Sequence, residues 1–190
     1  MSSVFNYMPI DFDSYLQQER DAEYRSEYID GKVYAIAGAS KTHNTIAVAL
    51  TATIETQLRE GCRVWQSDMK VVIEDEGKRF AYYSDLVVAC EEDSDDDYMC
   101  TRPRLIVEVL SPSTERIDFG EKLEKYTAIP SLMEYVLVSQ DVPLVRVLRR
   151  RGAWREEMYK AEDVFQLESV GIEASVSQIY RRVRKEVGLV

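Results

Sequence analysis

Two acidic residues inside apolar segments are the first candidates for chemistry. Glu108 lies in the segment Leu-Ile-Val-Glu-Val-Leu, residues 105–110, in which the other five residues are aliphatic. Asp85 begins a second apolar run, Leu86 to Ala89. Short aliphatic runs of this kind are typical of strands buried on both faces. Because an unpaired buried carboxylate is costly, each acidic residue needs a cation, a metal ion or an opening onto a cleft.

If these two strands are neighbours, their carboxylates come together and require positive charge between them. A site that offers only oxygen ligands suits Mg²⁺ or Mn²⁺. We therefore expect Asp85 and Glu108 to hold a divalent metal ion.

The helix predicted after the Glu108 strand supplies an organic cation. Asp118, Lys122 and Tyr126 follow one another at intervals of four residues, which places them near one helix face. Lys122 is therefore the candidate to reach the Glu108 carboxylate. The spacing alone also allows a simpler interpretation, in which Glu108 and Lys122 form only a buried ion pair.

The elements that position these residues follow from hydrophobic periodicity and turn signals. We predict one domain spanning 1–190, with a mixed central sheet flanked by helices and preceded by an N-terminal helix and a hairpin at Asp30-Gly31. The core order is helix, strand, strand, strand, helix, strand. The predicted helices span 10–24, 42–58, 118–129 and 175–187, and the predicted strands span 62–75, 82–90, 104–111, 134–140 and two segments of 144–160.

Composition and length fit a globular protein: the chain has 190 residues, of which 45% are hydrophobic and 31% charged. No apolar run approaches the roughly 20 residues that a membrane-spanning helix needs. The first residues lack the basic and apolar pattern of a signal peptide. We therefore expect a cytoplasmic protein with no membrane partner.

The net charge of −10 argues against non-specific coating of nucleic acid. The charge is uneven, since residues 141–190 hold 10 Lys and Arg against 8 Asp and Glu. The acidic block 91–97 is interpreted as a solvated loop. The run Arg149-Arg150-Arg151 beside a hairpin turn is either solvated or in contact with phosphates.

The cysteines Cys62, Cys90 and Cys100 have no metal-type spacing, and His43 is the one histidine, so a zinc site of sulfur and nitrogen ligands is excluded. We expect free thiols. A cysteine hydrolase that pairs His43 with one of them has little support, because no cysteine has a nucleophile context. At the start of its helix, His43 is either a capping or surface residue or a contact to a phosphate or metal-bound water.

Five short motifs in a fixed order carry a resemblance to a known family. The chain resembles the bacterial putative restriction endonuclease domain family, a branch of the PD-(D/E)XK nuclease superfamily, from about residue 10 to about residue 160. The motifs are YIDG at 28–31, SDMKV at 67–71, YYSDLVV at 82–88, PRLIVEVLSPSTE at 103–115 and DFGEKLEKY at 118–126.

This resemblance implies a restriction-endonuclease-like fold and hydrolysis of DNA phosphodiester bonds by a metal-activated water. Asp85 matches the motif aspartate and Glu108 matches the (D/E) position. Leu110 stands where the motif has lysine, and Lys122 on the next helix is the implied replacement. Glu27, just before YIDG, matches an acidic position that completes such sites.

Ser84 also departs from the motif, which has proline before its aspartate. The alternative is therefore a non-catalytic nuclease-fold protein that binds nucleic acid or protein. Because enzymes that cut both DNA strands often pair two sites, a homodimer is expected.

Overall fold

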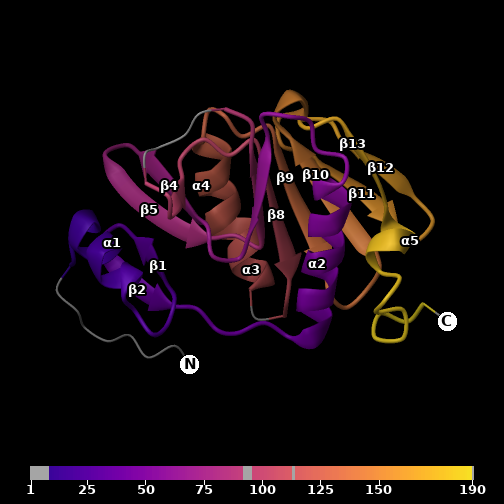
Figure 1. Cartoon of the computed structure of the whole chain (residues 1–190), viewed down its shortest axis with the longest axis horizontal. Coiled ribbons are helices and arrows are strands. Elements are labelled where there is room, and N and C mark those ends of the chain that lie inside the picture. The colour runs from indigo at the N-terminus through magenta and orange to yellow at the C-terminus, as the bar shows by residue number, and fades with distance from the viewer. Residues whose placement is uncertain (1–8, 92–95, 113, 190) are drawn as a thin grey trace.

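A six-stranded mixed sheet forms the centre of the molecule, in the order β11-β10-β9-β8-β6-β3. The computed structural model describes residues 9–91, 96–112 and 114–189 (Figure 1). β8 and β9 are parallel, while β6 runs antiparallel to β8. The strands are β3 Arg63–Gln66, β6 Leu86–Ala89, β8 Leu105–Leu110, β9 Glu134–Ser139, β10 Leu144–Arg149 and β11 Glu156–Lys160.

A second sheet of five strands lies beside the first, in the order β2-β1-β5-β4-β7. The Asp30-Gly31 hairpin predicted from the sequence joins β1 to β2, with both turn residues at positive φ. The strands are β1 Ser26–Ile29, β2 Lys32–Ala35, β4 Lys70–Asp75, β5 Lys78–Tyr83 and β7 Met99–Cys100. A two-stranded sheet, β12 Val164–Leu167 and β13 Ile172–Ser175, was not predicted.

The two large sheets share two chain segments, and this differs from the single sheet expected. Residues 62–75 form β3 in one sheet and β4 in the other, with Ser67 at φ 58° between them. Residues 82–90 likewise divide between β5 and β6. Period-two alternation continues through both segments, so the sequence does not reveal the change of sheet. Asp85 lies at the second crossing.

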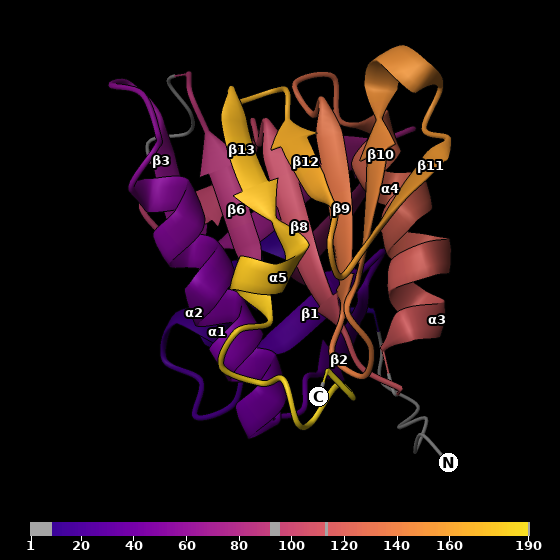
Figure 2. The ribbon, with the colours of Figure 1, turned by 90° about the vertical axis from the view of Figure 1, so that its right-hand side faces the viewer.

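Helices cover the two faces of the central sheet (Figure 2). On one face, α2 and α5 pack with the β12–β13 hairpin over Val107 and Val109 of β8. On the other, α4 packs over Ile106 and Leu110 with the second sheet. The helices are α1 Phe12–Arg20, α2 Lys41–Glu55, α3 Glu115–Ile117, the π-helix η1 Asp118–Lys122, α4 Leu123–Ala128, the 3₁₀-helix η2 Arg150–Gly152 and α5 Val176–Ile179.

The predicted terminal helix over 175–187 is wrong for most of its length. Helix α5 ends at Ile179, and turns continue the chain to residue 188. Val183 and Val187 remain buried. Their four-residue spacing serves turn-by-turn packing against the core, which helical periodicity alone does not distinguish from a continuous helix.

The expectation of three free thiols is also wrong, because Cys62 and Cys90 form a disulfide. Their neighbours Arg63 and Ala89 are cross-strand partners in the β3–β6 ladder, which brings the two cysteines together. Cys100, expected in a loop, lies buried in β7. Disulfides are rare in a reducing cytoplasm, so this bond and the predicted cytoplasmic location point in different directions.

The arginine run at the β10–β11 hairpin is structural rather than a phosphate contact. Arg149 is buried and pairs with Glu134 and Glu157. Arg150 donates to the backbone oxygens of Leu132, Thr127 and Ile129, and Arg151 pairs with Glu168. All three guanidinium groups therefore have partners within the fold.

Two further expectations concern the surface. None of the helices in the described part of the chain is long and apolar enough to cross a membrane. Of the acidic block, Glu91 and Asp97 are exposed, which fits a solvated segment, while residues 92–95 lie outside the described residues.

Candidate active site

The carboxylate of Glu108 lies inside the molecule, on the β8 face that points toward α4. The side chain of Glu108 is 4% exposed. Its Oε1 lies 3.3 Å from the Lys122 ammonium nitrogen and accepts a hydrogen bond from the Tyr126 hydroxyl at 3.2 Å. The cation that the sequence reasoning sought for Glu108 is therefore Lys122.

Lys122 has more than one acidic neighbour. Its Nζ lies 3.1 Å from Glu27 Oε1 and 3.6 Å from Asp118 Oδ1, and it donates to the backbone oxygen of Tyr83 at 3.3 Å. Because Glu27 is on β1 of the second sheet, Lys122 joins the two sheets at their common edge. This convergence is more than the isolated Glu108–Lys122 pair that the spacing allowed.

A π-helix presents Lys122 to the cluster. Residues Asp118–Lys122 form this wider turn between α3 and α4. Asp118 and Lys122 are both buried there, which is unusual for charged residues on a helix. Single π-turns inside α-helices occur frequently at functional sites.

Asp85 forms the more exposed side of the cluster. At the start of β6 it lies beside Glu108, whose Oε2 accepts a hydrogen bond from the Asp85 backbone N–H at 3.3 Å. Asp85 Oδ2 accepts from the Val109 backbone N–H at 2.6 Å. The side chain of Asp85 is 18% exposed.

His43, from the first turn of α2, contacts Asp85. Its Nε2 lies 3.1 Å from Asp85 Oδ2, and its side chain is 12% exposed. Ser40 caps the helix by accepting a hydrogen bond from the His43 backbone N–H, so the capping role considered for His43 belongs to Ser40. The buried His43 Nδ1 has no hydrogen-bond partner among the described residues.

Both departures from the family motif have a structural counterpart. Ser84, in place of proline, is buried with its hydroxyl 2.9 Å from the Tyr126 hydroxyl, which in turn holds Glu108. Leu110, in place of lysine, is buried in the core cluster beneath α4. The absent lysine is thus replaced in space by Lys122.

The electrostatics of the cluster follow from an excess of acid. Burial raises the pKa of Glu108 well above its usual value, and Asp118, Asp85 and Glu27 add to this while Lys122 opposes it. Burial likewise raises the pKa of Glu27 and of Asp118. Three carboxyl groups therefore hold their protons more tightly than in water.

The two basic groups respond to the same charges. Burial would lower the pKa of Lys122, but Glu108, Glu27 and Asp118 outweigh it and hold that pKa well above its usual value. Burial also opposes the charged form of His43, but the hydrogen bond and charge of Asp85 raise its pKa overall. Lys122 is therefore a fixed cation rather than a base at neutral pH.

The donor set fits the Mg²⁺ or Mn²⁺ ion expected from the sequence. Within residues 9–91, 96–112 and 114–189, no group of three or more His, Cys, Asp and Glu side chains is arranged to hold a metal ion. Mg²⁺ in proteins commonly takes one or two carboxylates and keeps several waters. The Asp85 and Glu108 carboxylates supply such a pair, and the excess negative charge around them favours a cation.

The sequence thus indicated the four predicted residues, and the structure brings them into one cluster. Glu27, Glu108 and Lys122 are in direct contact, and Asp85 joins them through its backbone bond to Glu108. Asp118 was not assigned to the site from the sequence. Its position one helical turn before Lys122 was the available signal.

Comparison with protein families and with individual proteins follows from this geometry. Residues 12–177 match the family model Uma2, described as "Putative restriction endonuclease". The chain belongs to this family. The resemblance drawn from the five sequence motifs is therefore confirmed.

The Uma2 match extends to individual proteins. An uncharacterized protein of Synechocystis sp. is 36% identical over 173 residues, covering 89% of this chain and 90% of that protein. A second uncharacterized Synechocystis protein is 37% identical over 130 residues, covering 66% of this chain and 72% of its own length.

A solved structure supports the same fold. The crystal structure of a protein from Anabaena variabilis, described as "a putative nuclease belonging to DUF820", aligns with a TM-score of 0.73 and 18% identity. The alignment covers 91% of this chain and 98% of that one. The restriction-endonuclease-like fold predicted from the sequence is therefore confirmed.

Proposed function

We propose that this protein is a Mg²⁺- or Mn²⁺-dependent endonuclease that hydrolyses DNA phosphodiester bonds. The observation that carries the proposal is the convergence of Asp85 and Glu108, from neighbouring strands, with the Lys122 ammonium group 3.3 Å from Glu108. Membership of the Uma2 family supports it.

The proposed roles follow from the contacts. Asp85 and Glu108 would hold the metal ion, which when bound lowers the pKa of a coordinated water and neutralises phosphate charge. The Val109 N–H fixes the orientation of Asp85, and the Tyr126 hydroxyl fixes that of Glu108.

Lys122 and Glu27 complete the machinery. Because acidic neighbours keep Lys122 protonated, it is suited to stabilise negative charge that develops on the phosphate rather than to deprotonate water. Glu27 pairs with Lys122 and so holds its ammonium group beside Glu108. We assign Glu27 a positioning role.

Plasmid cleavage with Mg²⁺ or Mn²⁺ tests the proposal. We expect Glu108→Gln and Lys122→Gln each to reduce nicking by about 10²–10³-fold, as removal of one charge-stabilising group does in other hydrolases. Glu124→Gln and Lys125→Gln are the matched controls, since both residues lie on α4 and pair with each other outside the cluster. Cleavage that survives Glu108→Gln unchanged would contradict the assignment.

The alternative is a nuclease fold kept for binding nucleic acid or protein. The closed cluster supports it, because Glu108 and Lys122 are nearly inaccessible and satisfy each other. Isothermal titration with Mn²⁺ separates the two functions. Binding that Asp85→Asn abolishes supports the enzyme, whereas no binding at millimolar Mn²⁺ supports the alternative.

The proposal includes a homodimer acting on DNA in the cytoplasm. The candidate interface is β2, an edge strand of the second sheet that is exposed along its whole length, with Val33 and Tyr34 nearly half exposed. Unpaired edge strands readily pair with a second copy. Sedimentation equilibrium should give twice the chain mass of 21.9 kDa, and Val33→Lys should return the monomer.

A further inference from the structure

The C-terminal turns carry the densest group of exposed cations in the described chain. Arg181, Arg182, Arg184 and Lys185 are all exposed, with Glu186 as the one acidic residue among them. This segment therefore has a net charge of +3 in a chain whose total is −10.

These four cations have no carboxylate partner among the described residues. The ion pairs found there engage other basic side chains, including the exposed Arg20, Arg102 and Arg151. In a chain with excess acid, an exposed basic segment that remains unpaired is available to an external anion.

The segment is held in place rather than free to move as a tail. Val183 is 3% exposed and Val187 is 4% exposed, and both belong to the core cluster that includes Ile46 and Leu50 of α2. The Leu189 backbone N–H donates to the Arg184 oxygen at 2.7 Å and closes the last turn. The cations therefore project from a fixed backbone.

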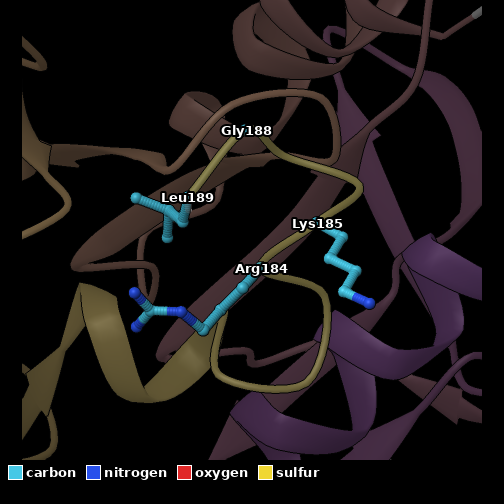
Figure 3. A pocket seen from close by; sticks show the side chains of 4 residues that line it. All are labelled: Arg184, Lys185, Gly188 and Leu189. Atoms are coloured by element: carbon cyan, nitrogen blue, oxygen red, sulfur yellow. The ribbon is translucent and has the colours of Figure 1, made fainter.

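Their arrangement leaves a hollow at the surface. Arg184, Lys185, Gly188 and Leu189 line a space of about 410 Å³. Figure 3 shows the Arg184 and Lys185 side chains extending to opposite sides of the chain. Two cations that flank a hollow match the spacing of separate negative groups along a polymer better than a single small anion.

The segment lies on the same side of the molecule as the candidate active site. Tyr180, just before it, donates to the Ser139 oxygen at the end of β9. The next residue of that loop, Gln140, accepts from Ser40, the N-cap of α2. His43 contacts Asp85 from the first turn of the same helix. In Figures 1 and 2 the C-terminal turns lie beside this end of α2.

We propose that Arg181, Arg182, Arg184 and Lys185 bind the phosphate backbone of duplex DNA and present it to the site at Asp85 and Glu108. The inference rests on the proposed function, because it takes DNA as the substrate. Fixed cations beside a buried acidic site resolve a difficulty of that function: the net charge of −10 repels DNA unless a local basic surface attracts it.

The test measures binding separately from cleavage. Fluorescence anisotropy of a labelled 20-base-pair duplex, without Mg²⁺ or Mn²⁺, gives the association constant K from low to physiological salt. We expect Arg184→Gln/Lys185→Gln to reduce the slope of log K against log salt by about 1.8, since each lost phosphate contact contributes about 0.9. Arg181→Gln/Arg182→Gln should have a similar effect.

The matched control is Arg59→Gln/Arg63→Gln. Both arginines are exposed, neither forms an ion pair with another described residue, and they follow the opposite end of α2. The control removes the same two charges and should leave the slope unchanged. Equal effects of control and test variants would show a general charge effect and overturn the proposal.

Other outcomes separate this inference from the proposed function. Cleavage by the wild type with unchanged binding in the C-terminal variants would overturn the inference and leave the nuclease intact. Weakened binding in those variants, with no cleavage by any form of the protein, would support the surface and favour the non-catalytic alternative. Preference of the segment for phosphatidylserine vesicles over duplex DNA would overturn the inference in favour of a lipid surface.

Discussion

Two buried charge clusters in this molecule are built on opposite principles. Around Glu134, one carboxylate meets one guanidinium: Arg149 Nε lies 2.9 Å away, and the backbone N–H groups of Glu168 and Ser169 also donate to Glu134. Around Lys122, three carboxylates share one ammonium group. Both clusters are buried, so burial of charge alone does not identify a functional site.

The difference lies in the balance of charge. Every oxygen of Glu134 accepts a hydrogen bond, which is typical of a structural ion pair. The Lys122 cluster has more acid than its lysine neutralises, and the pKa of Glu108 is raised well above its usual value by burial. Perturbed carboxyl groups of this kind gather at functional sites. The first cluster supports the fold, whereas the second is suited to a metal ion.

The largest effect on stability should come from breaking the balanced cluster. Arg149→Met leaves Glu134 buried without its cation and should reduce the free energy of unfolding by about 3–5 kcal/mol. Urea denaturation measures this. The control Arg151→Met removes a neighbouring but exposed pair with Glu168 and should leave the denaturation curve nearly unchanged. Equal, small losses in both would show that Glu134 does not depend on Arg149.

The next effect concerns the acidic cluster and its metal ion. His43→Ala removes the contact to Asp85 and should weaken Mn²⁺ affinity about 10–100-fold, as loss of a group that orients a metal ligand does. Isothermal titration provides the measurement. His43→Gln, whose amide can still donate to Asp85, should recover part of the affinity, and Asn44→Ala on the exposed side of α2 should have none of the effect. Unaltered affinity in His43→Ala would remove His43 from the site.

The pH dependence of stability should separate the clusters. The pKa values of Glu108, Glu27 and Asp118 are raised by burial, so protonation favours the folded state. The stability this contributes is present at acidic pH and is lost as the pH rises through the raised pKa values. With metal ions chelated, the melting temperature should therefore fall between about pH 5 and pH 8, with each pKa unit worth about 1.4 kcal/mol.

Two variants sharpen this pH prediction. Glu108→Gln cannot ionise, so it should reduce the pH dependence and melt above the wild type at pH 8. Glu134→Gln should melt below the wild type at every pH, because it leaves Arg149 uncompensated, while the pH dependence remains. A flat melting profile for the metal-free wild type would show that the cluster is already neutralised.

The smallest effect compares two serines. Ser84→Ala removes a 2.9 Å hydrogen bond to Tyr126, and Ser169→Ala removes one to Glu134. Each should cost about 0.5–1.5 kcal/mol in thermal or urea unfolding. Because Tyr126 also holds Glu108, Ser84→Ala should in addition weaken Mn²⁺ binding several-fold, whereas Ser169→Ala should not. The same Mn²⁺ affinity in both variants would separate Tyr126 from the metal site.

Much of the fold was determined by the sequence itself. Period-two and helical patterns predicted α2, β8 and β9 at nearly their observed bounds, since these elements are amphipathic or wholly apolar over their length. A charged residue in an apolar strand identified Asp85 and Glu108. The four-residue spacing placed Asp118, Lys122 and Tyr126 on one face, and all three are buried together.

Only the tertiary structure decided which partners these residues meet. The two changes of sheet, at 67–69 and 84–85, bring Glu27 beside Lys122, although 95 positions of the chain separate them in the sequence order given by their numbers. The Cys62–Cys90 disulfide, the partners of Arg149 and the exposure of Arg184 were likewise hidden. Local patterns reflect the energetics of one element, whereas these contacts depend on how several elements, far apart in the chain, pack against one another.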